Sequence, residues 1–270
     1  MNRIEQAFTL AREENRAAFV AYVCGGDPTP ADSLEVCRTL LENGTDILEI
    51  GMPFSDPLAD GLTNQLAAER ALEGGMTQEK LFALVREVRA FSNAPIVLYT
   101  YYNLLLAHGL ETFCRLAVEA GVDGVLTLDL PPEEAAELDA AFAQVGLKTV
   151  YIVAPTSPPE RIALIASHAT GFIYYVSQEG VTGVRDAVAS DLHQRVSAIR
   201  QHTALPVVVG FGISQPEHVK TVAAVADGVV VGSALVNCIA ATPSEPNRFL
   251  PLLKSKLDGL IPMLAKGQGT

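Results

Sequence analysis

Apolar, often β-branched residues gather along the chain in eight runs of five or six residues. Nearly every position in each run is apolar, whereas a strand with one face in water alternates between apolar and polar positions. Such continuous runs favour the strands of a parallel sheet that is covered on both faces. The predicted strands are 19–23, 46–50, 95–100, 124–129, 149–153, 172–177, 206–210 and 228–232.

The segments between these runs have the spacing of amphipathic helices. In the first of them, Leu34, Cys37 and Leu41 share one helical face, and several segments end in a glycine that is typical of a helix C-cap. Further helices are expected at 3–15 and 247–264, and residues 56–74 predict a loop with a short helix. The predicted helices between strands are 31–43, 77–90, 110–120, 132–145, 159–168, 189–202 and 215–226.

Eight strands that alternate with helices predict an α/β fold, namely a (β/α)8 TIM barrel with an extra N-terminal helix and additional helices. We expect residues 1–270 to form this barrel as a single domain, because no linker interrupts the pattern. A doubly wound sheet is the alternative. It would more commonly show a GxGxxG turn after its first strand, and here the first strand is followed by CGGDPTP.

Composition narrows the possible partners and location. The net charge of −12 argues against nucleic acid as a partner. No apolar run reaches 18 residues, so we expect no membrane-spanning helix. The first sixteen residues are charged and amphipathic and lack the apolar centre of a signal peptide, and the four cysteines are far apart. These features predict a cytoplasmic protein with reduced thiols.

Glu49 is a carboxylate inside an apolar run, and it is the strongest candidate for chemistry. Strand side chains alternate, so Leu48 and Ile50 can pack on helices while Glu49 points into the barrel. Barrel enzymes hold their active sites at the carboxyl ends of the strands. A partly desolvated carboxylate there has a raised pKa and suits a general acid or base. The alternative is a glutamate that is ion-paired to a neighbouring cation.

Other kinds of catalysis find little support in the sequence. Lys148 begins its strand and so lies at the end opposite the expected site, and the remaining lysines fall on helices or the tail. No strand ends in a histidine, and neither the histidines nor the cysteines have metal-ligand spacing. We therefore expect no metal and no cofactor, and a chemistry of carboxylates, hydroxyls and backbone amides.

Small, glycine-rich turns follow the last three predicted strands. GFGIS (210–214) and GSA (232–234) each lead into a helix, and barrels often bind a phosphate between these two loops. The Ser233 hydroxyl could contact the phosphate and cap the following helix, and SQEGVTGVR (177–185) could add the Gly183 amide or act as a lid. Ordinary turn glycines are the alternative. Aromatic residues near strand ends, including Tyr99, could form an apolar slot for a flat ring.

Several of these stretches together resemble the tryptophan synthase α subunit family. They are LEIGMPFSDPLADG (48–61), SQEGVTGVR, the GFGIS and GSA turns, GGDP (25–28), YYN (101–103) and DLP (129–131), and the similarity extends over essentially the whole chain. The resemblance implies a carbon–carbon lyase that cleaves indole-3-glycerol phosphate to indole and glyceraldehyde 3-phosphate in tryptophan biosynthesis. It also implies a β subunit partner in an α2β2 heterotetramer, to which the indole passes.

The resemblance also assigns roles to individual residues. It implies that Glu49 is the catalytic acid and base and that Asp60 accepts a hydrogen bond from the indole N–H. Thr182 corresponds to a lid residue that orders against Asp60 on closure. The implied phosphate ligands are Gly183, Gly212, Gly232 and Ser233. The implied ring slot is formed by Tyr22, Leu126, Tyr174 and Phe211, with Tyr101 nearby as a further substrate-binding residue.

The chain departs from the family pattern at three positions. Leu62 replaces the usual proline after the loop aspartate and its glycine, Tyr22 stands where phenylalanine is common, and Leu128 is larger than the usual residue. None removes a catalytic group. Two other functions remain open, a stand-alone lyase of the same substrate and a non-catalytic activator of a β partner. Other phosphate-binding barrels, such as phosphosugar epimerases, generally rely on a metal or a lysine at the strand ends.

Overall fold

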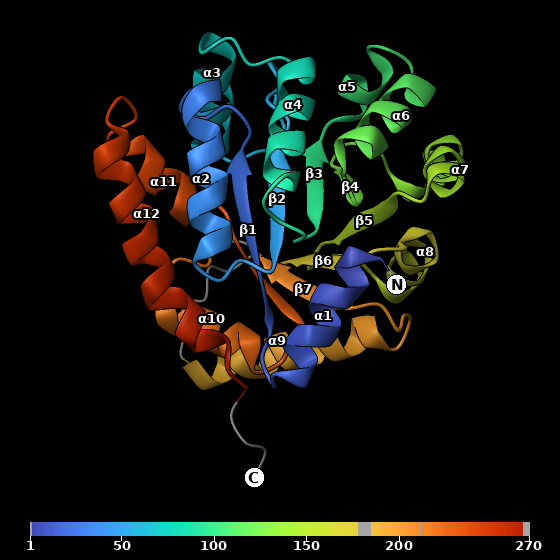
Figure 1. Ribbon diagram of the computed structural model, residues 1–270. Helices are drawn as coiled ribbons and strands as arrows, with labels where there is room; N and C mark the ends of the chain where they lie inside the picture. Colours follow the sequence, from blue (N-terminus) through green and yellow to red (C-terminus); the bar gives the residue numbers. More distant parts are fainter. Residues whose placement is uncertain (1, 178–184, 211, 267–270) are drawn as a thin grey trace.

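The computed structural model describes residues 2–177, 185–210 and 212–266. Eight parallel strands, each hydrogen-bonded to the next along the chain, close into a barrel when β1 pairs with β8. Figure 1 shows the strands at the centre with the helices arranged around them. The strands are β1 (Ala18–Cys24), β2 (Ile47–Gly51), β3 (Ile96–Thr100), β4 (Gly124–Thr127), β5 (Lys148–Val153), β6 (Ile173–Val176), β7 (Val207–Gly210) and β8 (Gly228–Val231).

Most of the α-helices cover the outside of the barrel. Along the described part of the chain, one of them precedes the first strand and two follow the last. Two short 3-10 helices, η1 (Pro132–Glu134) and η2 (Ile261–Leu264), are also present. The α-helices are α1 (Arg3–Glu13), α2 (Pro30–Glu42), α3 (Leu62–Glu73), α4 (Gln78–Arg89), α5 (Tyr102–Leu106), α6 (Leu110–Ala120), α7 (Ala136–Val145), α8 (Pro159–His168), α9 (Arg185–Arg200), α10 (Pro216–Ala223), α11 (Ser233–Ala240) and α12 (Pro246–Leu260).

The predicted barrel is confirmed, and each predicted strand matches an observed one to within two residues. The helices differ more. Helix α5 was not predicted, because five residues are too few to show a helical period. The predicted helix 132–145 is divided into η1 and α7, and α9 begins at Arg185, before the apolar period of its sequence starts at 189.

Two hydrophobic layers separate the inside of the barrel from its outside. Leu48 and Ile50 belong to the layer between strands and helices, as the alternation along β2 predicts, while Ile47 lies in the interior. Helix α1 covers one end of the barrel, where Phe8 meets Phe172 with ring centroids 5.7 Å apart. The interior residues on the strands are Ala18, Val20, Ile47, Val97, Leu126, Val150, Val208 and Val230, and Phe172 directly precedes β6.

Polar contacts fix the end of the barrel that α1 covers. Asp123 accepts hydrogen bonds from Arg3 and Arg89, at 3.0 and 2.9 Å, and Lys148 forms an ion pair with Glu5 of α1. Lys148 therefore lies far from the carboxyl ends of the strands, as predicted. No helix in the part of the chain that the structure describes is long and apolar enough to cross a membrane.

Candidate active site

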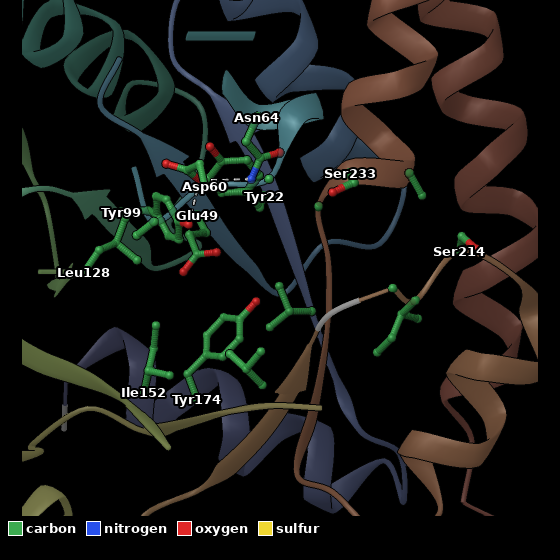
Figure 2. A pocket seen from close by; sticks show the side chains of 18 of the residues that line it. Tyr22, Glu49, Asp60, Asn64, Tyr99, Leu128, Ile152, Tyr174, Ser214 and Ser233 are labelled. Atoms are coloured by element: carbon green, nitrogen blue, oxygen red, sulfur yellow. Dashed lines mark hydrogen bonds between the residues drawn. The ribbon is translucent and has the colours of Figure 1, made fainter. Parts of the chain in front are cut away.

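A cavity of about 370 Å³ lies at the carboxyl ends of the strands. Its wall comes from the ends of strands on opposite sides of the barrel and from the loops after β2, β7 and β8. Figure 2 shows these side chains converging on one space, with Glu49, Asp60 and Tyr99 close together. The lining includes Tyr22, Glu49, Asp60, Asn64, Tyr99, Leu128, Ile152, Tyr174, Gly212, Ser214, Gly232, Ser233 and Asn237.

Glu49 lies on β2 with its Cα opposite those of Tyr22 and Val97, and its side chain faces the cavity. The residue is only 1 % exposed, and its Oε1 has no hydrogen-bond partner in the structure. Among the described residues no cation forms an ion pair with it. Burial, and then the nearby Asp60 carboxylate, raises the pKa of Glu49 from 4.5 to about 8. An unpaired acid therefore remains protonated at neutral pH.

Asp60 lies on the loop after β2, and three side chains hold its carboxylate. The Tyr99 hydroxyl donates to Oδ1 at 2.8 Å, and the Tyr101 hydroxyl donates to Oδ2 at 2.7 Å. Asn64 Nδ2 adds a longer bond of 3.3 Å to Oδ1. The Tyr101 oxygen also accepts the backbone N–H of Ala59 at 3.0 Å. The carboxylate is thus fixed at the cavity wall before any substrate enters.

A buried ion pair supports the helix that follows Asp60. Asp27, after β1, is fully buried and accepts two hydrogen bonds from Arg70 of α3, at 2.7 and 2.8 Å. A bidentate arginine–carboxylate pair fixes both distance and orientation. This pair joins α3, and therefore the loop that ends in Asp60, to the end of the first strand.

Two tyrosines fit against glycines on neighbouring strands. A Cβ built at Gly51 would lie 2.6 Å from the Tyr22 hydroxyl, and one at Gly210 would collide with the hydroxyl of Tyr174. The Tyr22 ring also meets the Tyr99 ring edge-on, with centroids 4.9 Å apart. Burial raises the pKa of both Tyr22 and Tyr174 well above 10, so their hydroxyls stay neutral. Tyr22 and Tyr174 therefore contribute aromatic, uncharged surface to the cavity wall.

The turns after β7 and β8 form the opposite side of the cavity. Gly212 has φ +68°, a left-handed conformation that favours glycine, and Ser214 follows it in the lining. Gly232 is the N-cap of α11, whose first residue is Ser233, and the first N–H groups of a helix have no partners within it. This side therefore offers backbone amides to an anion. The predicted side-chain cap by Ser233 is wrong, because no side chain caps this helix.

Comparisons with known proteins agree with this geometry. Residues 8–258 match the family model described as tryptophan synthase alpha chain. The tryptophan synthase alpha chain of Opitutus terrae is 62 % identical over 261 residues, which are 97 % of this chain and 98 % of that protein. The chain belongs to the tryptophan synthase α chain family.

Solved structures of this family have the same fold. The α chain from Legionella pneumophila is 34 % identical, with a TM-score of 0.89 over 98 % of this chain and 97 % of that one. A tryptophan synthase chain from Mycobacterium tuberculosis is 32 % identical, with a TM-score of 0.88 over 99 % of this chain and all of that one. Members of the tryptophan synthase α chain family are carbon–carbon lyases of tryptophan biosynthesis that cleave indole-3-glycerol phosphate and act with a β subunit.

The structure brings most of the residues that the sequence singled out to this one cavity, as expected for an α chain. Tyr101 reaches the site through Asp60 and is not part of the lining. Leu126 lies deeper, in the barrel interior, and Leu128 lines the cavity instead. Thr182, Gly183 and Phe211 lie outside the described residues. The cavity contains Tyr22, Glu49, Asp60, Tyr174, Gly212, Gly232 and Ser233 from the predicted set.

Some residues of this α-chain cavity were missed by the sequence interpretation. Asn64 lies in the first turn of α3, and its position four residues after Asp60 was the available signal. Leu128 was singled out only as a larger residue than the family usually has, and it replaces Leu126 in the lining because it lies two positions later, just past the carboxyl end of β4. Ile152 follows the interior residue Val150 by two positions on β5, so strand alternation was its signal, whereas Asn237 offered none. No cluster of three or more metal-ligating side chains occurs in the described part of the chain.

Proposed function

We propose that Glu49 and Asp60 are the catalytic pair for the cleavage of indole-3-glycerol phosphate to indole and glyceraldehyde 3-phosphate. The observation that supports this assignment most directly is the state of Glu49. It is buried, its Oε1 is unpaired, and its pKa is raised to about 8 in a cavity that also holds Asp60. An acid that is protonated at neutral pH can donate its proton to carbon, and its carboxylate can then accept one.

The first step is protonation of the indole ring. Glu49 gives its proton to C3 of the ring, the carbon that bears the glycerol chain, and C3 becomes tetrahedral. Positive charge then spreads to the ring nitrogen, and its N–H becomes more acidic. The Asp60 carboxylate accepts a hydrogen bond from this N–H and stabilises the charge as it develops.

The second step breaks the carbon–carbon bond. The Glu49 carboxylate accepts the proton of the glycerol hydroxyl next to the ring, and a carbonyl forms on that carbon as the bond to C3 breaks. The bonding electrons return to the ring, which restores neutral indole and releases glyceraldehyde 3-phosphate. Glu49 ends the cycle protonated, so the reaction has no net proton transfer and needs no oxidant or reductant.

The remaining cavity residues suit the two ends of the substrate. Tyr22, Tyr174 and Leu128 offer a flat apolar wall for the indole ring, and the turns at Gly212 and at Gly232–Ser233 offer backbone amides for the phosphate. Tyr101 acts through Asp60 in this assignment. Gly183 remains a predicted phosphate ligand, Phe211 and Leu126 predicted ring contacts, and Thr182 a predicted lid residue.

The proposal extends to assembly and location. The protein acts with a β subunit in an α2β2 heterotetramer, and the indole passes to that β subunit. It is a biosynthetic enzyme of the cytoplasm. Residues 1–270 form one domain. Exposed apolar side chains on the β2–α3 segment, Leu58 at 91 % and Leu62 at 70 %, support a partner surface near Asp60. A stand-alone lyase and a non-catalytic activator of a β partner are the two alternatives.

Indole release from indole-3-glycerol phosphate tests the assignment, measured with the purified chain alone and with a tryptophan synthase β subunit. Glu49→Gln should abolish turnover while substrate binding persists, because the change removes the proton and nearly preserves the shape. Asp60→Asn should lower kcat by roughly 100-fold or more, since a charged acceptor is lost. Appreciable turnover by Glu49→Gln would contradict the acid–base role.

The same assay separates the alternatives. Weak activity alone with strong activation by the β subunit supports the proposed function. High activity alone without activation would favour the stand-alone lyase. A wild-type chain that binds the β subunit and releases no indole in either condition would leave the non-catalytic activator.

A further inference from the structure

We propose that Tyr99 is a positioning residue that holds Asp60 against the barrel wall and leaves one of its lone pairs directed at the indole N–H. The inference rests on the proposed function of Asp60 as the acceptor of that N–H. Tyr99 acts here through Asp60 and takes no proton from the substrate.

Tyr99 joins the loop to the rigid part of the protein. Asp60 belongs to a loop, whereas Tyr99 is a residue of β3 whose Cα lies opposite Gly51 on one side and Leu126 on the other. Tyr101 binds the same carboxylate but is the N-cap of the short helix α5, and its oxygen also accepts the N–H of the loop itself. In the described part of the chain, the Tyr99 hydroxyl is the link from a barrel strand to this carboxylate.

The Tyr99 side chain is itself held in place. Its ring meets the Tyr22 ring edge-on at 64°, and Tyr22 is in turn fitted against Gly51. Burial, and then the charge of Asp60, raises the pKa of Tyr99 far above 10, so its hydroxyl remains a donor at every pH at which the protein works. Figure 2 shows the ring beside Asp60 at the cavity wall.

The hydrogen bonds to Asp60 leave one acceptor position of its carboxylate unoccupied. An ionised carboxylate has about four lone-pair positions, two on each oxygen. Tyr99 and Asn64 occupy both positions on Oδ1, whereas only Tyr101 donates to Oδ2 among the described residues. As far as the described residues show, the free position is on Oδ2. Loss of the Tyr99 hydroxyl would free a position on Oδ1 and let the carboxylate turn, so the acceptor would no longer be fixed for the ring N–H.

A pair of non-cleavable ligands tests this role. One is an indole-3-alkyl phosphate, and the other is the matching benzofuran, in which oxygen replaces the ring N–H. Dissociation constants are measured for the wild type, for Tyr99→Phe, and for Tyr175→Phe as the control. Tyr99→Phe keeps the ring contact with Tyr22. Tyr175 is on β6 and, unlike Tyr99, does not line the cavity; it lines a separate pocket beside α8 and α9.

We expect Tyr99→Phe to bind the indole ligand about tenfold more weakly, as for the loss of one hydrogen bond to a charged group, and to bind the benzofuran ligand as the wild type does. Its kcat for indole release should fall more than its KM rises, and Tyr175→Phe should match the wild type. Equal weakening toward both ligands, or none, would overturn the positioning role. A wild type that does not prefer the indole ligand would instead contradict the assigned role of Asp60.

Discussion

Glu49 should make the protein less stable as the pH rises, and Glu49→Gln should remove this effect. The unfolded chain releases the Glu49 proton near pH 4.5, whereas the folded protein retains it up to about pH 8. Between these values the folded state binds one more proton than the unfolded state, so the free energy of unfolding decreases with pH. Below pH 4.5 both states are protonated, and above pH 8 both are ionised.

The size of the effect follows from this interval. Each pH unit within it lowers the free energy of unfolding by about 1.4 kcal/mol, so the full cost of ionising buried Glu49 is about 5 kcal/mol. Glutamine has the shape of the protonated acid and cannot ionise. The advantage of Glu49→Gln over the wild type should therefore increase from about 1 kcal/mol at pH 5.5 to about 3 kcal/mol at pH 7 and about 5 kcal/mol above pH 8.

Urea denaturation of both proteins, followed by circular dichroism at each pH, measures this difference. Comparison at the same pH cancels the titration of all other groups that the two proteins share. Glu13→Gln, which changes an exposed glutamate at the end of α1, is the control and should differ from the wild type by the same small amount at every pH. A Glu49→Gln advantage that stays constant from pH 5.5 to 8.5 would refute the argument that Glu49 is buried as an unpaired acid.

Two further changes test the support of the Asp60 loop. Arg70→Met should lower the free energy of unfolding by about 3–5 kcal/mol, because it leaves the fully buried Asp27 carboxylate without its partner. Adding Asp27→Asn should recover part of that loss, and no recovery in urea denaturation would contradict the explanation. Leu62→Pro should raise the free energy of unfolding by about 0.4–1 kcal/mol, because residue 62 is the first residue of α3, a position where proline fits. Leu66→Pro, inside the same helix, should instead destabilise it, by about 3 kcal/mol in the same experiment.

The fold could be predicted from the sequence because one physical cause governs it throughout. Each strand is buried on both faces, and so each strand is a continuous apolar run. The alternation of side chains placed Glu49, because along β2 it leaves Ile47 and Glu49 on the inside and Leu48 and Ile50 on the outside. An acid at an interior position near a strand end needs no tertiary information to be recognised as unusual.

The environment of Asp60 could not be predicted in this way. Its partners Tyr99 and Tyr101 lie 39 and 41 residues further along the chain, and nothing in the local pattern specifies how a loop turns toward them. The pairing of Asp27 with Arg70 across 43 residues is of the same kind. Leu126 and Leu128 point to the same side of the sheet, so alternation cannot tell which of them lines the cavity. That depends on how far the cavity extends into the barrel, which is a property of the folded structure.

The close fit of Tyr22 on Gly51 and of Tyr174 on Gly210 has a consequence for how this sequence can change over time. A methyl group at position 51 is tolerated only if the hydroxyl at position 22 is lost, because both would occupy the same space. Homologous chains should therefore vary in pairs, with alanine at position 51 accompanied by phenylalanine at position 22 and never by tyrosine. The conflict between positions 210 and 174 is stronger, because a methyl group at 210 would also lie 2.8 Å from a ring carbon of Tyr174, so alanine there requires a residue smaller than phenylalanine at 174. Each glycine and the tyrosine that packs on it should therefore change together. A single substitution at either glycine should be rare unless the tyrosine has already been replaced by a smaller residue.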